Sequence, residues 1–244
     1  MFVRLFRRVY AGGGDSVQVG FFSKFDLIWA TLIVFIILSA FAASTASSQR
    51  TSSENINTFD LLYSVMAWWG AILGPTLLSL WMRGLKPGSV FGVDRMPVGR
   101  SLLLGVALLI AALPLVFAVD YAASLLLKAN PQEVVQIFES SSTGAQRIPI
   151  ILLAVVVAPV AEELAFRGYL YGVVKRYCGA IPALFLSGTL FALIHQNLTA
   201  FFPLFVLASV FALAYELSGS LLVPMTMHAL FNAFTLILVL VEQK

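Results

Sequence analysis

The chain has 244 residues, of which 60% are hydrophobic and only 11% are charged, and its formal net charge is +3. A soluble domain is about half apolar and about 25% charged, so this composition excludes a soluble globular protein. It also excludes a disordered chain, which needs few apolar residues and many charges. A polytopic membrane protein remains. An all-α transmembrane bundle is expected, because a helix satisfies its own backbone hydrogen bonds in lipid.

Seven apolar stretches approach or exceed the length that a membrane-spanning helix needs, which is about 20 residues. They lie at 27–43, 59–82, 100–119, 149–174, 181–197, 200–217 and 222–241. The first stretch is longer than the core of a signal peptide and is expected to be an uncleaved span. Segment 131–139 has apolar residues on one helical face only, which predicts an interfacial amphipathic helix rather than an eighth span.

The distribution of Lys and Arg predicts the orientation in the membrane. Ten of them fall before the first span and in the loops after the second and fourth spans, against four in the other loops and at the C-terminal end. Loops rich in Lys and Arg stay in the cytoplasm, so the N-terminus is predicted to be cytoplasmic and the C-terminus outside. These charges form no concentrated basic patch, and no nucleic-acid partner is expected. Compact size and short loops favour the cytoplasmic membrane of a bacterium.

The predicted organisation is one integral membrane domain with three regions. Residues 1–26 form a basic cytoplasmic tail, 27–148 form three spans with their loops, and 149–244 form a helical core that carries the polar residues. The single cysteine, Cys178, excludes an internal disulfide and a multi-thiolate metal site, and it is expected to pack as a small apolar side chain.

Several other conspicuous residues are expected to be structural. Trp68, Trp69 and Trp81 are predicted to serve as packing residues and interface anchors. Asp120 and Glu216 lie toward the ends of their spans, where a snorkelling or capping role is expected.

Ionisable side chains inside the spans are the informative ones, because each costs about 2.5–3.5 kcal/mol near the bilayer centre. Such residues mark functional sites by default. Together with one amide, they are Glu162, Glu163 and Arg167 in the fourth span, His195 in the fifth, and His228 and Asn232 in the seventh.

Helical spacing predicts which of these side chains meet. Glu163 and Arg167 are four residues apart, so they share a helix face and can form an ion pair. Glu162 is turned by about 100° from Glu163 and points elsewhere. A spacing of four also relates two further pairs, Phe191 with His195 and His228 with Asn232.

The depth of these residues is consistent with one shared cavity. At a rise of about 1.5 Å per residue, Glu162 and His195 each lie about 20 Å from the turn between the fourth and fifth spans. His228 and Asn232 are nearer the start of the seventh span. A polar, water-filled cavity between spans four to seven, opening to the cytoplasm, would reach all of them. Pro159 removes a backbone hydrogen bond and is expected to loosen the helix before the carboxylates.

A carboxylate and an imidazole beside one water can generate a nucleophile by general base catalysis. Glu162 is the predicted base, because Glu163 pairs with Arg167. A second imidazole and an amide can donate hydrogen bonds to a developing oxyanion. This set suits hydrolysis of a peptide bond without serine or metal, and the chain has neither a G-x-S-x-G nor an H-E-x-x-H motif.

Two other interpretations stay open. Glu162, His195 and His228 could be the three ligands of a zinc site with an open position, although such a site gives Asn232 no role. The protein could also be a non-catalytic membrane scaffold or an immunity-type protein that binds its partner within the bilayer, with ion pairs that are purely structural.

Three motifs carry a resemblance to a known family. EELAFR at 162–167 fits E-E-x-x-x-R, FALIH at 191–195 fits F-x-x-x-H, and HALFN at 228–232 fits H-x-x-x-N. In order and spacing they resemble the CPBP family, which contains type II CAAX prenyl endopeptidases and bacteriocin-processing or self-protection membrane proteins. The resemblance covers about 149–241, and the first three spans match no motif.

The resemblance implies a glutamate-dependent intramembrane endopeptidase that needs no cofactor and acts on a membrane-associated or prenylated peptide or protein. It implies that Glu162 and His195 activate water and that His228 and Asn232 form an oxyanion hole. Glu163, Arg167 and Phe191 would support the site.

Overall fold

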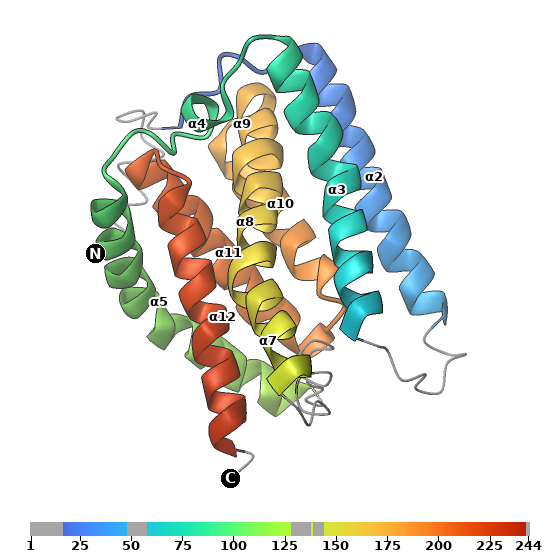
Figure 1. Cartoon of the computed structure of the whole chain (residues 1–244), viewed down its shortest axis with the longest axis vertical. Coiled ribbons are helices and arrows are strands. Elements are labelled where there is room, and N and C mark those ends of the chain that lie inside the picture. Colours follow the sequence, from blue (N-terminus) through green and yellow to red (C-terminus); the bar gives the residue numbers. More distant parts are fainter. Residues whose placement is uncertain (1–16, 48–57, 128–137, 139–143, 243–244) are drawn as a thin grey trace.

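The computed structural model describes residues 17–47, 58–127, 138 and 144–242, and this part of the chain is helical (Figure 1). Seven of its helices are separated along the chain by non-helical residues: α2 (Lys24–Ser47), α3 (Thr58–Met82), the single turn α4 (Pro87–Val90), α5 (Val98–Leu126), α10 (Ala180–Ile194), α11 (Leu198–Ser218) and α12 (Leu222–Glu242). Between α5 and α10 runs a continuous helix made of α7 (Gly144–Leu152), the π-helix η1 (Leu153–Val157), α8 (Ala158–Glu163), the π-helix η2 (Leu164–Tyr171) and α9 (Gly172–Cys178). The predicted all-α bundle is confirmed.

Six helical segments of the described chain are long and apolar enough to cross a membrane. They are Lys24–Ala43, Leu62–Met82, Val98–Leu126, Arg147–Cys178, Leu198–Ser218 and Leu222–Val241. All seven predicted stretches are therefore helical, but the fifth, α10, has only 15 residues. At about 1.5 Å per residue it is about 22 Å long, which is shorter than the hydrocarbon core. The predicted helix at 131–139 lies outside the described residues except for Phe138, and most of the basic tail does too.

The long helices run between two ends of the bundle (Figure 1). One end carries the start of α2, the turn α4, the end of α9 and the connection from α11 to α12; we call it the α4 end. The other end carries the end of α2, the starts of α3 and α7 and the end of α5; we call it the α7 end. The run from α7 to α9 crosses the bundle between these ends, surrounded by the other helices.

Two glycines on this central run let aromatic rings close the α4 end. Phe91, which follows α4, packs against Gly168, where a Cβ atom would come within 2.9 Å of the ring. Phe22, just before α2, packs in the same way against Gly172. Glycines four residues apart lie on one helix face, so both rings approach the same side of the run. The backbone of Leu221 also donates to the carbonyl of Phe91, at 3.1 Å, which fixes the α4 segment over the connection from α11 to α12.

Buried polar contacts tie the α2–α3 pair to the central run at this end. Asp26 has no exposed surface and accepts hydrogen bonds from Arg83 at 2.8 Å and from the Ser23 hydroxyl at 2.7 Å. The hydroxyl of Tyr169, on η2, lies 3.2 Å from the other carboxylate oxygen of Asp26. One carboxylate therefore connects the start of α2, the end of α3 and η2.

Glu216 forms a second buried polar cluster, so the snorkelling or capping role expected for it is wrong. Its carboxylate accepts from Lys175 at 2.6 Å and from the Tyr171 hydroxyl at 2.8 Å. Lys175 donates in addition to the carbonyl of Val17, at 3.1 Å. A charge buried near the end of a span is tolerated here because its counter-charge comes from the neighbouring helix.

Two further predictions concern the cysteine and the tryptophans. Cys178 is exposed at the end of α9, so the prediction that it packs inside is wrong. In the last turn of that helix only Lys175 is buried, and the three residues after it are exposed. Trp81 is 71% exposed on α3, whereas Trp69 is buried in the core and packs edge-on against Phe166 at 6.0 Å between ring centroids.

The Lys175–Glu216 pair gives a stability prediction. Lys175→Met leaves the Glu216 carboxylate buried without its counter-charge, which should lower the free energy of unfolding by about 3–5 kcal/mol. Thermal unfolding of the purified protein in detergent measures the loss. The neighbouring exposed Arg176→Met is the matched control and should unfold near the wild-type temperature. Equal melting temperatures for the two variants would contradict the prediction.

Candidate active site

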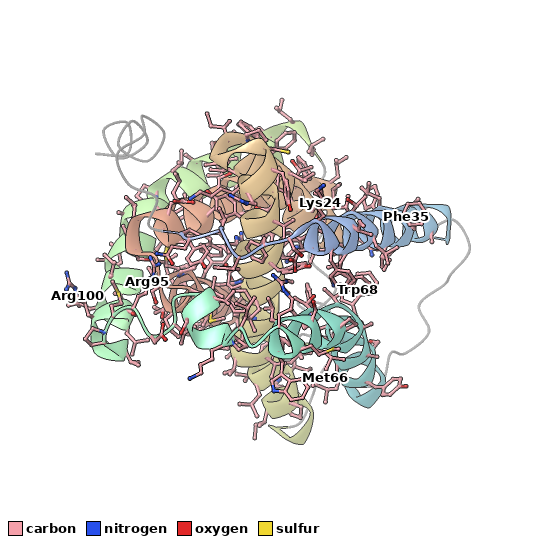
Figure 2. The ribbon with its side chains drawn as sticks, turned by 90° about the horizontal axis from the view of Figure 1, so that it is seen from above. Lys24, Phe35, Met66, Trp68, Arg95 and Arg100 are labelled. Carbon is pink, nitrogen blue, oxygen red and sulfur yellow. The ribbon has the colours of Figure 1, made fainter. Side chains whose placement is uncertain are left out.

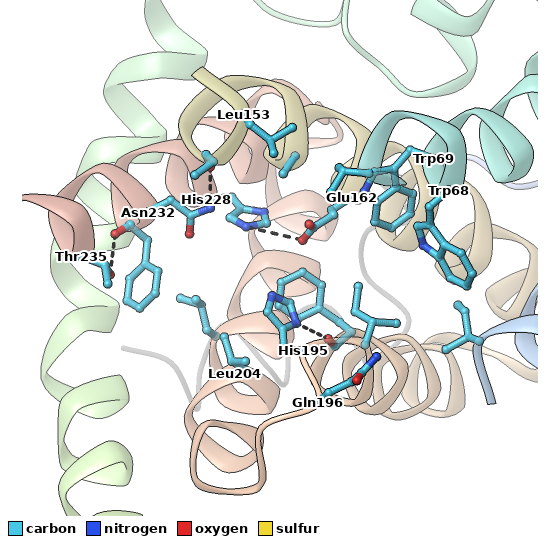
Figure 3. A pocket seen from close by; sticks show the side chains of 18 of the residues that line it. Trp68, Trp69, Leu153, Glu162, His195, Gln196, Leu204, His228, Asn232 and Thr235 are labelled. Carbon is cyan, nitrogen blue, oxygen red and sulfur yellow. Dashed lines mark hydrogen bonds and ion pairs between the residues drawn. The ribbon is translucent and has the colours of Figure 1, made fainter. Parts of the chain in front are cut away.

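Five of the predicted site residues line one cavity of about 720 Å³: Glu162, Phe191, His195, His228 and Asn232 (Figure 3). They come from α8, the end of α10 and α12. The three motifs are therefore brought together as predicted. Glu163 and Arg167 lie outside the lining.

The sequence predicted a cavity between spans four to seven, but residues of the first two spans also line it. The helices α2 and α3 supply a largely apolar wall that includes Ile37, Phe41, Val65, Trp68 and Trp69. No sequence motif identifies these residues, because the first three spans carry none. The adjacent tryptophans were the one available signal, and they were interpreted as packing residues and anchors.

Glu162 faces the cavity with an unused hydrogen-bonding atom. The residue is only 9% exposed, and among the described residues its buried Oε2 atom has no hydrogen-bond partner. The nearest ionic group is Nε2 of His228, which is 3.8 Å from Oε2 and so beyond hydrogen-bond distance. Since buried polar atoms are normally satisfied, an unsatisfied carboxylate oxygen at a cavity wall is positioned to bind water or substrate.

Glu163 points away from the cavity and joins two side chains. Its Oε1 atom accepts from Arg167 at 2.8 Å, which confirms the predicted pair, and from Nδ1 of His228 at 2.9 Å. The second contact was not predicted. A carboxylate that is paired with arginine can only accept, so Nδ1 of His228 carries the proton and Nε2 is turned toward Glu162. Glu163 thus orients a cavity residue from behind, as outer-shell carboxylates do in other histidine sites.

Arg167 is completely buried, and its charge is compensated on several sides. Besides Glu163, it donates to the carbonyl of Ala208 on α11, at 3.1 Å. Its guanidinium lies over the rings of Phe191 at 4.5 Å and Phe211 at 5.2 Å, within the range of cation–π attraction. Phe191 therefore supports the site by contacting both Arg167 and the ring of His195, which is 4.8 Å from it between centroids.

His195 is held by its own helix. Its Nδ1 atom lies 2.7 Å from the carbonyl of Phe191, and because a carbonyl can only accept, Nδ1 carries the hydrogen. In the neutral ring Nε2 is therefore a free acceptor. Figure 3 shows the His195 ring across the cavity from Glu162. The chain turns directly after His195, where Gln196 has a φ of 50°, a strained value for a non-glycine residue. Asn197 then caps the start of α11, because its side-chain oxygen accepts a hydrogen bond from the backbone amide of Ala200 at 3.0 Å.

Asn232 is positioned by an irregularity in the opposite helix. In η1 the amide of Ala158 donates to Leu153, five residues back, which is the π-helical pattern. The next amide, which would serve the carbonyl of Ala154, belongs to Pro159 and does not exist. The Ala154 carbonyl accepts instead from Nδ2 of Asn232, at 2.8 Å. The loosening expected near Pro159 is thus a π-helical turn that binds Asn232.

No group of three or more His, Cys, Asp or Glu side chains with a metal-holding arrangement occurs among residues 17–47, 58–127, 138 and 144–242.

The cavity also extends in a different direction from the one predicted. Its lining includes the exposed Ser64 and Gln196, which lie toward the α7 end, whereas the loops rich in Lys and Arg lie at the α4 end. The lining therefore lies away from the basic loops, toward which the sequence predicted the opening.

Comparisons with known proteins match the segment of the chain that contains these residues. Residues 144–234 match the family model described as type II CAAX prenyl endopeptidase Rce1-like. The chain is also 33% identical over 107 residues to the membrane-embedded CAAX protease MroQ of Staphylococcus aureus. That similarity covers 41% of this chain and 43% of the relative, so the chain matches less than half of that protein's length. No solved structure matches the chain significantly.

The fold and the site therefore define a polytopic helical membrane protein with an acidic and histidine-lined intramembrane cavity. The segment that carries the three motifs is similar to the Rce1-like type II CAAX prenyl endopeptidases, which agrees with the CPBP resemblance of the motifs.

The two adjacent glutamates should respond differently to the same substitution. Glu163→Gln removes the counter-charge of the buried Arg167 and should lower the free energy of unfolding by about 3–5 kcal/mol. Glu162→Gln keeps the shape of a side chain whose Oε2 has no partner, so the stability should change little. Thermal unfolding in detergent compares the two. A larger loss for Glu162→Gln would contradict the assigned roles.

Proposed function

We propose that the protein is an intramembrane endopeptidase that hydrolyses a peptide bond with water activated by Glu162 and His195. The observation that supports this most is the pair of unused acceptors facing one cavity, Oε2 of Glu162 and Nε2 of His195. Purely structural residues would be expected to satisfy each other. Here His195 is hydrogen-bonded to its own helix, and both side chains line the cavity with one atom unused among the described residues.

The proposed reaction follows from the hydrogen-bonding capacities of the side chains. A water bound between Glu162 and His195 loses a proton to the carboxylate while its oxygen attacks the carbonyl carbon of the substrate. The resulting oxyanion accepts hydrogen bonds from Asn232 and from Nε2 of His228, which can donate when both nitrogens of that ring carry a hydrogen. The amide of Asn232 has two hydrogens, and only one is used by Ala154, so one remains for the oxyanion. The carbon–nitrogen bond then breaks, and the leaving nitrogen receives the proton from Glu162.

The proposed substrate is a membrane-associated peptide or protein, which includes prenylated ones. The matching family model and the S. aureus relative both bear the name of CAAX proteases. The wall formed by Ile37, Phe41 and Trp68 offers an apolar surface beside the polar residues. A chain with a polar peptide bond next to an apolar or lipid-modified part fits such a cavity. We propose the cytoplasmic membrane of a bacterium as its location.

The first test is to map peptide termini across membrane proteins in cells that lack the endogenous gene and express either the wild type or Glu162→Gln. The two proteins are compared at equal abundance in the membrane. The proposal expects termini that occur only with the wild type, because loss of the base should remove nearly all turnover while the fold is kept. These termini would also identify the substrates and the cleaved bonds.

The same cells test the other interpretations. If both versions give identical termini and both rescue the deletion phenotype, the protein acts as a scaffold or immunity-type partner and the proposal fails. Metal analysis of the purified protein tests the zinc interpretation. Stoichiometric zinc, whose removal abolishes cleavage and whose return restores it, would replace the proposed metal-independent mechanism.

Pro159→Ala tests whether the π-helical turn positions Asn232. The new amide at 159 can donate to the Ala154 carbonyl and compete with Asn232. We expect the melting temperature to be unchanged or higher, because a helix hydrogen bond is gained, while the cleavage rate falls by roughly tenfold or more, in the range seen for lost oxyanion donors. The rate of terminus formation at equal protein level measures this. A variant that keeps full activity would show that the Ala154 contact is not required.

A further inference from the structure

The lining of the cavity lies in one half of the bundle. On the central run it includes Leu153, Ala154, Ala158 and Glu162, and no residue between Glu162 and Cys178. On α2 it begins at Ile37 and on α3 it ends at Trp69, so on both helices it occupies the part near the α7 end. On α12 it runs from His228 to Leu236, which is the middle of that helix.

The other half of the bundle is closed. Arg167, Tyr171, Phe91 and Phe211 are all less than 2% exposed and fill the space between Glu162 and the α4 end. Gly168 lets the ring of Phe91 pack directly on the central run. The depth of His195 agrees, because α10 places it about 22 Å from the α4 end, beyond the middle of a core about 30 Å thick.

The two ends also differ in charge. Seven described Lys and Arg residues lie at the α4 end: Lys24, Arg83, Lys86, Arg95, Arg100, Lys175 and Arg176. Figure 2, which looks onto this end, shows Lys24, Arg95 and Arg100 spread across it. At the α7 end the described residues include only Arg147. Short loops with an excess of Lys and Arg face the cytoplasm, so the α4 end is the cytoplasmic one.

We infer that the cavity opens to the extracytoplasmic side of the membrane. The substrate, which rests on the proposed function, is then a peptide bond of a membrane-anchored polypeptide presented at the outer surface. A segment exposed only to the cytoplasm cannot reach Glu162, because the buried residues at the α4 end lie in between. The opening and the basic loops thus lie on opposite sides of the bilayer.

The single native cysteine makes a direct test possible. Cys178 is exposed at the α4 end and reports on that side in the wild type. In a Cys178→Ser background, Leu198→Cys places a reporter at the first residue of α11, at the α7 end, where the native side chain is 71% exposed. Ser64→Cys, a change of one atom, places a reporter in the cavity wall. Ser89→Cys on α4 supplies a second reporter for the cytoplasmic side.

Cells with an intact cytoplasmic membrane are treated with a membrane-impermeant maleimide, before and after permeabilisation. We expect full labelling of Leu198→Cys and Ser64→Cys in intact cells, and labelling of Cys178 and Ser89→Cys only after permeabilisation. The reverse pattern, or labelling of Ser64→Cys only after permeabilisation, would overturn the inference. Labelling does not need turnover, so Glu162→Gln should give the same pattern. An inactive protein with the expected labelling would refute the proposed function and leave the opening as inferred.

Discussion

The buried contact between Glu163 and Arg167 is the interaction on which the rest of the site depends. Two charges with no exposed surface are stable within a membrane protein only when each is paired and hydrogen-bonded. Arg167 meets this condition through Glu163, the Ala208 carbonyl and two aromatic rings. Glu163 meets it through Arg167 and His228. The pair therefore connects α11 to the central run, α10 and α12, which carry the three motifs.

The two neighbouring glutamates have different surroundings in this arrangement. Adjacent residues on a helix point about 100° apart, so one carboxylate can be paired with a buried charge in the interior while the other faces the cavity. Glu163 has little freedom, because its Oε1 atom accepts from two side chains. Glu162 keeps an oxygen without a partner. Glu162, the proposed catalytic group, thus lies on a helix whose position is fixed by the contacts of the adjacent Glu163.

Irregular helix geometry also shapes the site, in addition to the pairing of side chains. The two π-helical stretches on either side of α8 change which residues face the cavity and leave a carbonyl without its amide at Pro159. Asn232 uses that carbonyl. The closed α4 end depends in a similar way on the missing side chains of Gly168 and Gly172, which allow Phe91 and Phe22 to approach the backbone. Small local exceptions to regular helix geometry therefore shape both the site and its one-sided cavity.

The sequence by itself determined the helical class, the positions of all seven apolar helices, the Glu163–Arg167 pair and the resemblance to the CPBP family. These follow from composition, from the i, i+4 rule and from three motifs, all of which are local properties of the chain. The tertiary structure alone decided that Glu163 also holds His228, that Glu216 is paired with Lys175, and that α2 and α3 wall the cavity. It also decided which end of the cavity is closed. Contacts between helices far apart in the chain have no periodic signature, because they depend on which faces meet when the bundle packs.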